Sequence, residues 1–198
     1  MAFIAFLGCD GSGKTTVIER VVEEFSRSGT PVARGHWRPD CLKFSRRRVA
    51  ESQIENPRNQ IPRGKFASII KLGWIWINWW IGWFFHLRGA SRRGHVVFDR
   101  YHVDLTIDPI RYRYGGPGWF ARFLVSKMPQ PDMVFYLDAP ADVLLSRKQE
   151  VDPEDLQELR NGYLRLCMGR SDMFVIDANR APYEITRDVV DRIRKFAS

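Results

Sequence analysis

The chain has 198 residues, of which 44% are hydrophobic and 27% charged, a balance that excludes intrinsic disorder, collagen-like repeats and disulfide-rich scaffolds. Its formal net charge is +8, and seven of the 31 basic residues are lysine, so 24 are arginine. Because guanidinium groups contact phosphate in a bidentate manner, this bias favours a phosphate-bearing ligand. The three cysteines share no metal-like spacing and the first residues lack a signal-peptide pattern, which predicts a reduced, cytoplasmic protein.

Short apolar runs alternate with longer amphipathic segments along the chain, which is the pattern of βαβ units and a parallel sheet. Strands are predicted at residues 2–7, 32–36, 95–99, 133–138 and 173–177. Helices are predicted at about 14–28, 119–127, 140–150, 153–168 and 182–196, residues 46–65 as a helix followed by a loop, and 104–118 as a loop. We therefore expect a single α/β domain, residues 1–198, with three layers and a five-stranded parallel sheet flanked by helices.

A glycine-rich segment after the first strand fits the phosphate-loop pattern G-x-x-x-x-G-K-[ST] and precedes a helix, as that chemistry requires. Glycines allow backbone N–H groups to point inward at an anion, and the helix N-terminus adds partial positive charge. We expect Lys14 to bridge the β- and γ-phosphates of ATP and the Thr15 hydroxyl to bind Mg²⁺. The loop residues predicted to bind ATP are Gly8, Asp10, Gly11, Ser12, Gly13, Lys14, Thr15 and Thr16. The predicted fold is thus that of a P-loop NTPase.

A second carboxylate is predicted at the end of a neighbouring strand, where a P-loop site needs an acid to hold Mg²⁺. Asp99 ends the run His95-Val96-Val97-Phe98-Asp99 and is followed directly by Arg100. The alternative is a structural ion pair, but the upstream P-loop favours the metal role for Asp99.

Four segments together resemble the thymidylate kinase family of nucleoside monophosphate kinases. They are the loop G-C-D-G-S-G-K-T-T at 8–16, F-D-R-Y at 98–101, P-D-M-V-F-Y-L-D-A-P at 131–140 followed by Arg147, and V-I-D-A at 175–178. The resemblance implies ATP and Mg²⁺ as cofactors and transfer of a γ-phosphoryl group to a nucleotide. It also implies that Asp10 contacts the acceptor or the metal shell, that Arg100 clamps phosphates, that Arg147 lies against the adenine in a lid, and that the turn Asn179–Ala181 lines the base.

The acceptor half of the chain departs from that family. A tryptophan-rich block replaces the family's central helix, and after D-R-Y the chain has Asp104 and then Asp108-Pro109. Arginines and tyrosines surround these acids, which would suit a phosphorylated or hydroxylated acceptor. The residues predicted to bind the acceptor are Asp10, Arg38, Arg100, Asp104, Asp108, Arg111 and Arg113. A loop held by its own ion pairs is the alternative.

An apolar helix is predicted at about 66–88, and it carries most of the tryptophans. A membrane span would separate the P-loop and Asp99 onto opposite sides of a bilayer, so spanning is excluded. Burial in the core, a homodimer interface, and a helix lying on a membrane surface with Arg88, Arg92 and Arg93 remain open. The arginine clusters lack any nucleic-acid recognition motif, so no nucleic-acid partner is expected.

A short lid is predicted at about 146–154, with Arg147 and Lys148 as its cations and Arg160 as a solvated residue of the next helix. Lys14, Asp99, Arg100 and Arg147 are the predicted catalytic residues. The leading function is an ATP-dependent kinase of a nucleoside monophosphate, with thymidylate first. The alternatives are a kinase of another phosphorylated or hydroxylated metabolite, such as a surface-polysaccharide sugar, and a membrane-associated nucleotide-dependent switch.

Overall fold

The computed structural model describes residues 1–37, 61–149 and 151–197, and these residues form two compact units that are described separately below. The first unit comprises residues 1–37, 88–101 and 131–198, and the second comprises 38–87 and 102–130. The helix predicted to begin at residue 46 lies outside the described residues. No helix in the described ranges combines the length and the apolar character needed to cross a membrane.

The first unit contains a five-stranded sheet in the order β2-β3-β1-β4-β5, with every neighbouring pair parallel. Its strands are β1 (Phe3–Leu7), β2 (Val32–His36), β3 (His95–Asp99), β4 (Met133–Asp138) and β5 (Met173–Asp177). The three central strands are buried along nearly their whole length, as their continuous apolar sequences predict. The predicted α/β class and five-stranded parallel sheet are confirmed.

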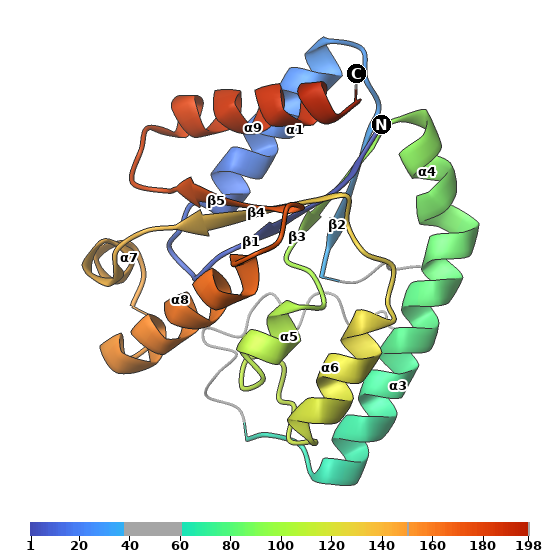
Figure 1. Cartoon of the computed structure of the whole chain (residues 1–198), viewed down its shortest axis with the longest axis vertical. Coiled ribbons are helices and arrows are strands. Elements are labelled where there is room, and N and C mark those ends of the chain that lie inside the picture. The colour runs from blue at the N-terminus through green and yellow to red at the C-terminus, as the bar shows by residue number, and fades with distance from the viewer. Residues whose placement is uncertain (38–60, 150, 198) are drawn as a thin grey trace. The chain divides into compact units, whose positions relative to one another are not determined.

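The helices of this unit cover both faces of the sheet. They are α1 (Lys14–Arg27), α4 (Arg88–Arg93), α7 (Ala141–Arg147), α8 (Pro153–Cys167) and α9 (Pro182–Ala197). Figure 1 shows α1 and α9 on one side of the sheet and α8 on the other. The buried side chains of α1 recur every three or four residues, at Val17, Ile18, Val21 and Phe25, as an amphipathic helix requires. All five strands point their carboxyl ends to the edge where the glycine-rich loop lies.

Two predicted element boundaries are wrong, one in the first unit and one in the second. Helix α7 ends at Arg147 rather than at residue 150, because the backbone of Lys148 is extended, with φ −158° and ψ 119°. The segment predicted as a loop from residue 104 begins with a short helix, α5 (Asp104–Ile107).

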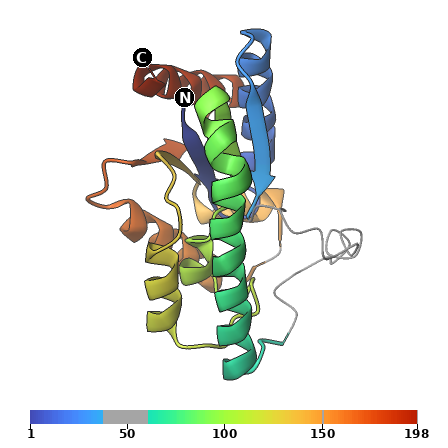
Figure 2. The same ribbon diagram turned by 90° about the vertical axis from the view of Figure 1, so that its right-hand side faces the viewer.

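The second unit is helical. Its main elements are α3 (Lys65–Gly82), a π-helical turn, η2 (Trp83–Leu87), and α6 (Gly118–Ser126). Helix α6 lies beside α3 (Figure 2), and the buried face of α3 carries Leu72, Ile75 and Trp79. The single predicted helix at 66–88 is therefore interrupted at Trp83. The helix is also buried on one face only, since Phe66 and Ile70 are 85% and 72% exposed, so full burial in the core is wrong.

Candidate functional site

The glycine-rich loop joins β1 to α1 in the first unit, and its backbone conformation depends on glycine. Gly11 and Gly13 have φ values of +84° and +78°, in the left-handed region that side chains disfavour. A Cβ at Gly11 would also lie 2.8 Å from the carbonyl oxygen of Leu144, so the site has no room for a side chain. The left-handed Gly13 stands directly before the first residue of α1, whose amino end favours an anion.

Lys14 begins α1 and places its ammonium group inside this loop. Its Nζ donates hydrogen bonds to the carbonyl oxygens of Gly8 and Cys9, both at 2.8 Å, and to Ser12 Oγ at 3.3 Å. The side chain is buried, with 7% of the residue exposed. A cation held by three oxygens at the loop is positioned to meet a phosphate bound by the loop amides. The structure thus brings Lys14 together with the predicted glycines.

Two carboxylates end the strands that flank β1, and their surroundings differ. Asp99 ends β3 and is paired in register with Phe6 of β1, two residues before the loop begins. Its Oδ1 is buried and has no hydrogen-bond partner among the described residues. A buried acceptor oxygen without a donor is costly unless a ligand satisfies it. This oxygen therefore fits a metal shell, as predicted for Asp99.

Asp138, at the end of β4, is fully engaged instead. Arg160 of α8 donates from Nε to its Oδ1 at 2.7 Å and from a terminal nitrogen to its Oδ2 at 2.9 Å. Tyr136 adds a hydroxyl bond to Oδ1 at 3.1 Å. Burial raises the pKa of the Tyr136 phenol and the bond to Asp138 raises the pKa of Arg160, so both stay protonated donors. The prediction that Arg160 is a solvated residue is wrong, because the carboxylate holds it.

Asp10 and Arg100 form an ion pair that links the loop to the end of β3. The shortest distance joins a guanidinium nitrogen of Arg100 to Asp10 Oδ1 at 2.6 Å, and the two side chains are 6% and 14% exposed. Arg100 adopts a left-handed backbone, with φ 63°, and its N–H donates to the carbonyl oxygen of Phe6. A non-glycine residue in this region is uncommon and marks a constrained position. The pair orients one predicted phosphate-binding arginine across the loop.

Arg147, at the end of α7, touches two segments predicted to bind ATP. One of its terminal nitrogens lies 3.2 Å from the carbonyl oxygen of Ala178 and 3.5 Å from that of Gly11. The structure therefore brings the predicted lid arginine to the loop and to the turn after β5. Lys148 is exposed, and residue 150 lies outside the described residues.

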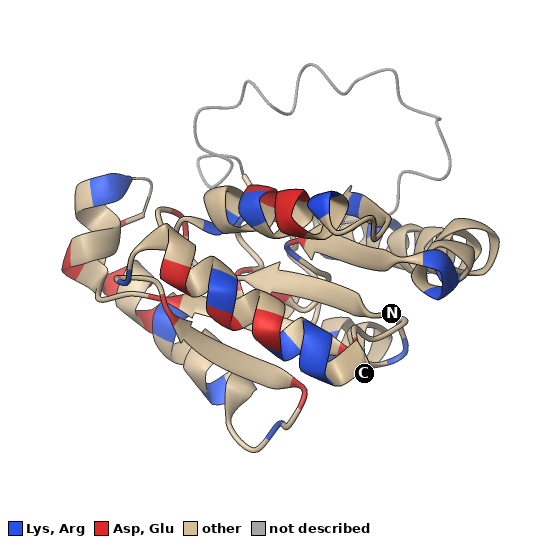
Figure 3. Cartoon of the chain, turned by 90° about the horizontal axis from the view of Figure 1, so that it is seen from above, with Lys and Arg blue, Asp and Glu red and all other residues tan. Residues whose placement is uncertain are grey.

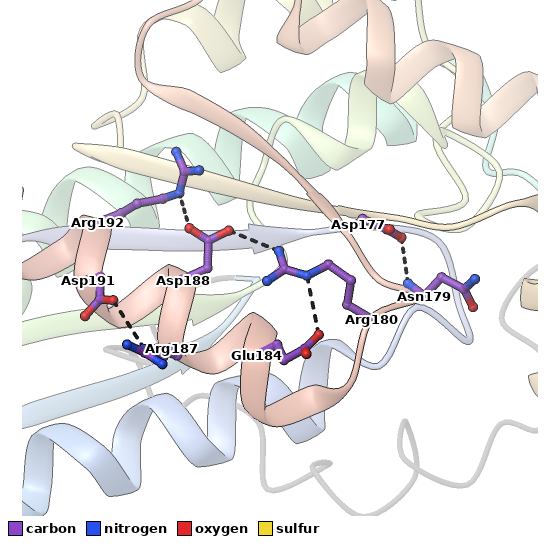
Figure 4. A network of polar contacts seen from close by, with 8 residues as sticks. All are labelled: Asp177, Asn179, Arg180, Glu184, Arg187, Asp188, Asp191 and Arg192. Carbon is purple, nitrogen blue, oxygen red and sulfur yellow. Dashed lines mark hydrogen bonds and ion pairs between the residues drawn. The ribbon is translucent and has the colours of Figure 1, made fainter.

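The turn after β5 is held by side chains of its own segment and of α9. Asp177 Oδ1 accepts a hydrogen bond from the backbone N–H of Asn179 at 2.8 Å. Arg180 forms ion pairs with Glu184 and Asp188 of α9 (Figure 4). Arg192 also donates to Asp188, at 2.7 Å. These contacts hold the backbone of the turn that contains the predicted base-lining residues, Asn179 and Ala181.

The remaining predicted acceptor residues belong to the second unit. Asp104 is fully buried and accepts the Tyr112 hydroxyl at 3.2 Å, while Asp108 is 5% exposed and accepts the backbone N–H of Arg111 at 3.2 Å. Arg113 has φ 53° and donates from Nε to the carbonyl oxygen of residue 61. Each of these predicted residues is therefore held by a contact of its own within the second unit. Arg38 lies outside the described residues.

Comparison with known proteins agrees with this geometry. A probable thymidylate kinase 1 from Saccharolobus solfataricus is 24% identical over 97% of this chain and 96% of its own length. A probable thymidylate kinase from Pyrobaculum aerophilum is 26% identical over 98% and 97%, and a thymidylate kinase from Pediococcus pentosaceus is 24% identical over 96% and 95%. The chain is thymidylate kinase-like.

No protein-family model matches the sequence of this thymidylate kinase-like protein. The similarity to the three relatives nevertheless extends over nearly all of each protein, so it includes both halves of the chain. The predicted resemblance to thymidylate kinases and the predicted enzyme class, a phosphotransferase, are confirmed.

Proposed function

We propose that the protein is an ATP- and Mg²⁺-dependent kinase that transfers the γ-phosphoryl group to a nucleoside monophosphate, with thymidylate (dTMP) as the first acceptor. One observation carries the proposal: the buried Asp99 Oδ1 has no partner among the described residues and ends the strand beside the one that leads into the P-loop. A glycine cradle with a lysine ammonium and one unsatisfied carboxylate oxygen suits a metal–triphosphate complex.

The roles of the chain's own groups follow from their positions. The loop amides and Lys14 would hold the phosphates, and the exposed hydroxyl of Thr15 and the carboxylate of Asp99 would bind Mg²⁺. When bound, the metal neutralises charge on the phosphates. Arg100, oriented by Asp10, would clamp phosphate oxygens, and Arg147 would close the lid over the nucleotide. Positioning and electrostatic stabilisation are the main tasks of a protein in phosphoryl transfer.

The relatives named as thymidylate kinases support dTMP as the acceptor. A second acceptor class has support from a specific contact, the hydrogen bond from Tyr112 to the buried Asp104. A carboxylate held in this way would suit removal of a proton from a hydroxyl group, which a phosphate acceptor does not need. A kinase of a hydroxylated metabolite, such as a sugar, is therefore the second candidate.

The deciding experiment measures ADP formation with a panel of acceptors. We expect turnover that requires an added nucleoside monophosphate, fastest with dTMP, and that falls by about 1,000-fold in Lys14→Ala. Turnover with sugars but with no nucleotide would select the second candidate. ADP formation at the same slow rate with and without every acceptor would refute both candidates and indicate a nucleotide-dependent switch.

The two free cysteines of the described chain, Cys9 and Cys167, support the proposed cytoplasmic location.

A further inference from the structure

The turn that joins β5 to α9, residues 178–181, lies at the same edge of the sheet as the P-loop. In the strand order, β5 is two positions from β1, which leads into the P-loop. Neighbouring strands are about 4.8 Å apart, so roughly 10 Å separate the turn from the loop. Arg147 spans this gap, since one of its terminal nitrogens lies 3.2 Å from the carbonyl oxygen of Ala178 and 3.5 Å from that of Gly11. A nucleotide with its phosphates in the P-loop would therefore have its base within reach of the turn.

The backbone of this turn is hydrogen-bonded on both sides of its middle. The N–H of Ala178 donates to the carbonyl oxygen of Asp138 on β4 at 2.6 Å, and the carbonyl oxygen of Ala181 accepts the N–H of Glu184 at 3.0 Å. Arg180, between them, makes no main-chain hydrogen bond with the described residues. It is bound through its side chain, so the position of the middle of the turn depends on the partners of this guanidinium group.

Asp188 of α9 is the acid that connects this guanidinium group to the rest of the first unit. Its Oδ2 lies 3.4 Å from a terminal nitrogen of Arg180, and its Oδ1 accepts a hydrogen bond from Arg192 Nε at 2.7 Å (Figure 4). Arg192 in turn lies over the ring of Phe174 on β5, 5.2 Å from the ring centroid. Glu184 adds a longer contact to Arg180, at 3.7 Å. One carboxylate, 27% exposed, therefore joins the turn to α9 and, through a second arginine, to β5.

Another acid of the same helix makes no such connection. Acidic and basic positions alternate along α9 (Figure 3), which is typical of a solvated helix face. Among the described residues, Asp191 pairs only with Arg187 of its own helix, at 3.9 Å, and the two side chains are 62% and 86% exposed. Asp191 has the charge of Asp188 and lies less than one helical turn away, but it does not contact the turn. It is therefore a matched control for Asp188.

We propose that Asp188 is a positioning residue for the base of the bound nucleotide, because it holds Arg180 and so fixes the turn against which the base lies. The inference rests on the proposed function, since it needs a triphosphate in the P-loop. The sign of the effect separates positioning from simple charge. Removal of an acid near a site for an anion should strengthen binding through electrostatics alone. Loss of a positioned turn should weaken it.

The test is calorimetry of the full chain with Mg²⁺ and either ATP or inorganic tripolyphosphate, which has the phosphates but no base. We expect Asp188→Asn to weaken ATP binding about threefold, the scale of a partly exposed ion pair, and to leave tripolyphosphate binding unchanged. Asp188→Glu, which keeps the charge, should restore most of the ATP affinity. Asp191→Asn should bind both ligands as tightly as the wild type or slightly more tightly.

Differential scanning fluorimetry of each variant checks that the fold is intact. Unchanged or tighter binding of ATP by Asp188→Asn overturns the proposal, and so does an equal weakening by Asp191→Asn. An equal loss of affinity for ATP and tripolyphosphate also overturns it, since that result would indicate a general loosening of the site. A wild type that binds neither ligand would refute the proposed function itself, and this inference with it, so the two failures are distinguishable.

Discussion

The two carboxylates that flank β1 should respond in opposite ways to the same substitution, aspartate to asparagine. Asp99 has a buried oxygen with no partner among the described residues, whereas Asp138 is bound by Arg160 and Tyr136. Asn keeps the shape of the side chain and removes its charge. Asp99→Asn should therefore strongly slow the metal-dependent reaction with little effect on folding, and Asp138→Asn should destabilise the fold while metal dependence remains.

The magnitudes follow from burial and contacts. In Asp138→Asn, the bidentate pair loses its charge, and Arg160 is left only 24% exposed without a carboxylate. Hydrogen bonds to charged groups are worth about 1.5–3 kcal/mol and fully buried pairs more, so a loss of about 2 kcal/mol is expected. For a chain of 198 residues this corresponds to a fall in Tm of about 4–8 °C. In Asp99→Asn the Tm should stay within about 2 °C or rise, while kcat falls by about 100-fold.

Differential scanning fluorimetry and ADP formation titrated with Mg²⁺ measure both effects on the same samples. The wild type and Asp138→Asn should reach half-maximal rate at similar Mg²⁺ concentrations, and removal of the metal with EDTA should stop both. The assignment of Asp99 to the metal would be refuted if Asp99→Asn melted several degrees lower and kept its dependence on Mg²⁺. Arg160→Lys, which keeps the charge and loses the bidentate geometry, should show an intermediate Tm.

Three further predictions use the same protein. Gly11→Ala should weaken ATP binding, measured by calorimetry, by tenfold or more, because the added Cβ meets a carbonyl oxygen at 2.8 Å. Gly13→Ala has open space around its Cβ and should lose only about 1 kcal/mol to backbone strain. Equal losses of ATP affinity in the two variants would contradict this difference. Arg147→Ala should raise KM for ATP several-fold and leave Tm unchanged, and an unchanged KM would remove Arg147 from the lid. Burial lowers the pKa of His95 and of His102 below the unfolded value of 6.5, so each neutral ring contributes stability above pH 6.5 that is lost as the pH falls through the folded-state pKa. Urea unfolding should show a loss of at most about 1.4 kcal/mol per pH unit for each histidine, and a flat profile from pH 7 to 5 would contradict the assignment.

The donor half of the site could be predicted from the sequence because its signals are local. The P-loop needs glycines, a lysine and a hydroxyl within eight residues, and each has its place between a strand and a helix. Asp99 could be predicted as well, since parallel strands bring their carboxyl ends to one edge and an acid at such an end must face the loop. The register of β3 against β1 places it there.

The pair Asp138–Arg160 could not be predicted in this way. Its partners lie 22 positions apart, and Arg160 belongs to a helix with several charged residues, none of which is marked by spacing or composition. Only the packing of α8 against β4 selects it. The same reason separates Asp138 from Asp99, because two acids at equivalent strand ends differ only in which one a distant arginine neutralises.

The Trp-rich segment shows what the hydrophobic periodicity of a sequence cannot predict. Apolar residues on almost every side of 66–88 predict a helix and favour burial, but they do not identify the face that packs. Tertiary packing decides this: Leu72 and Trp79 are buried, with Trp79 against His102, while Phe66 and Ile70 of the same helix are exposed. The orientation of a uniformly apolar helix is therefore tertiary information.

Charge in the second unit also bears on the acceptor. A nucleoside monophosphate is an anion, and the only two acids in the described part of this unit are buried and bound, Asp104 by Tyr112 and Asp108 by a backbone N–H. The field that the described residues of the unit present to solvent is consequently positive, which raises the local concentration of anions and speeds their encounter. A neutral sugar would gain nothing from that field. The basic surface of the described residues thus favours a phosphorylated acceptor.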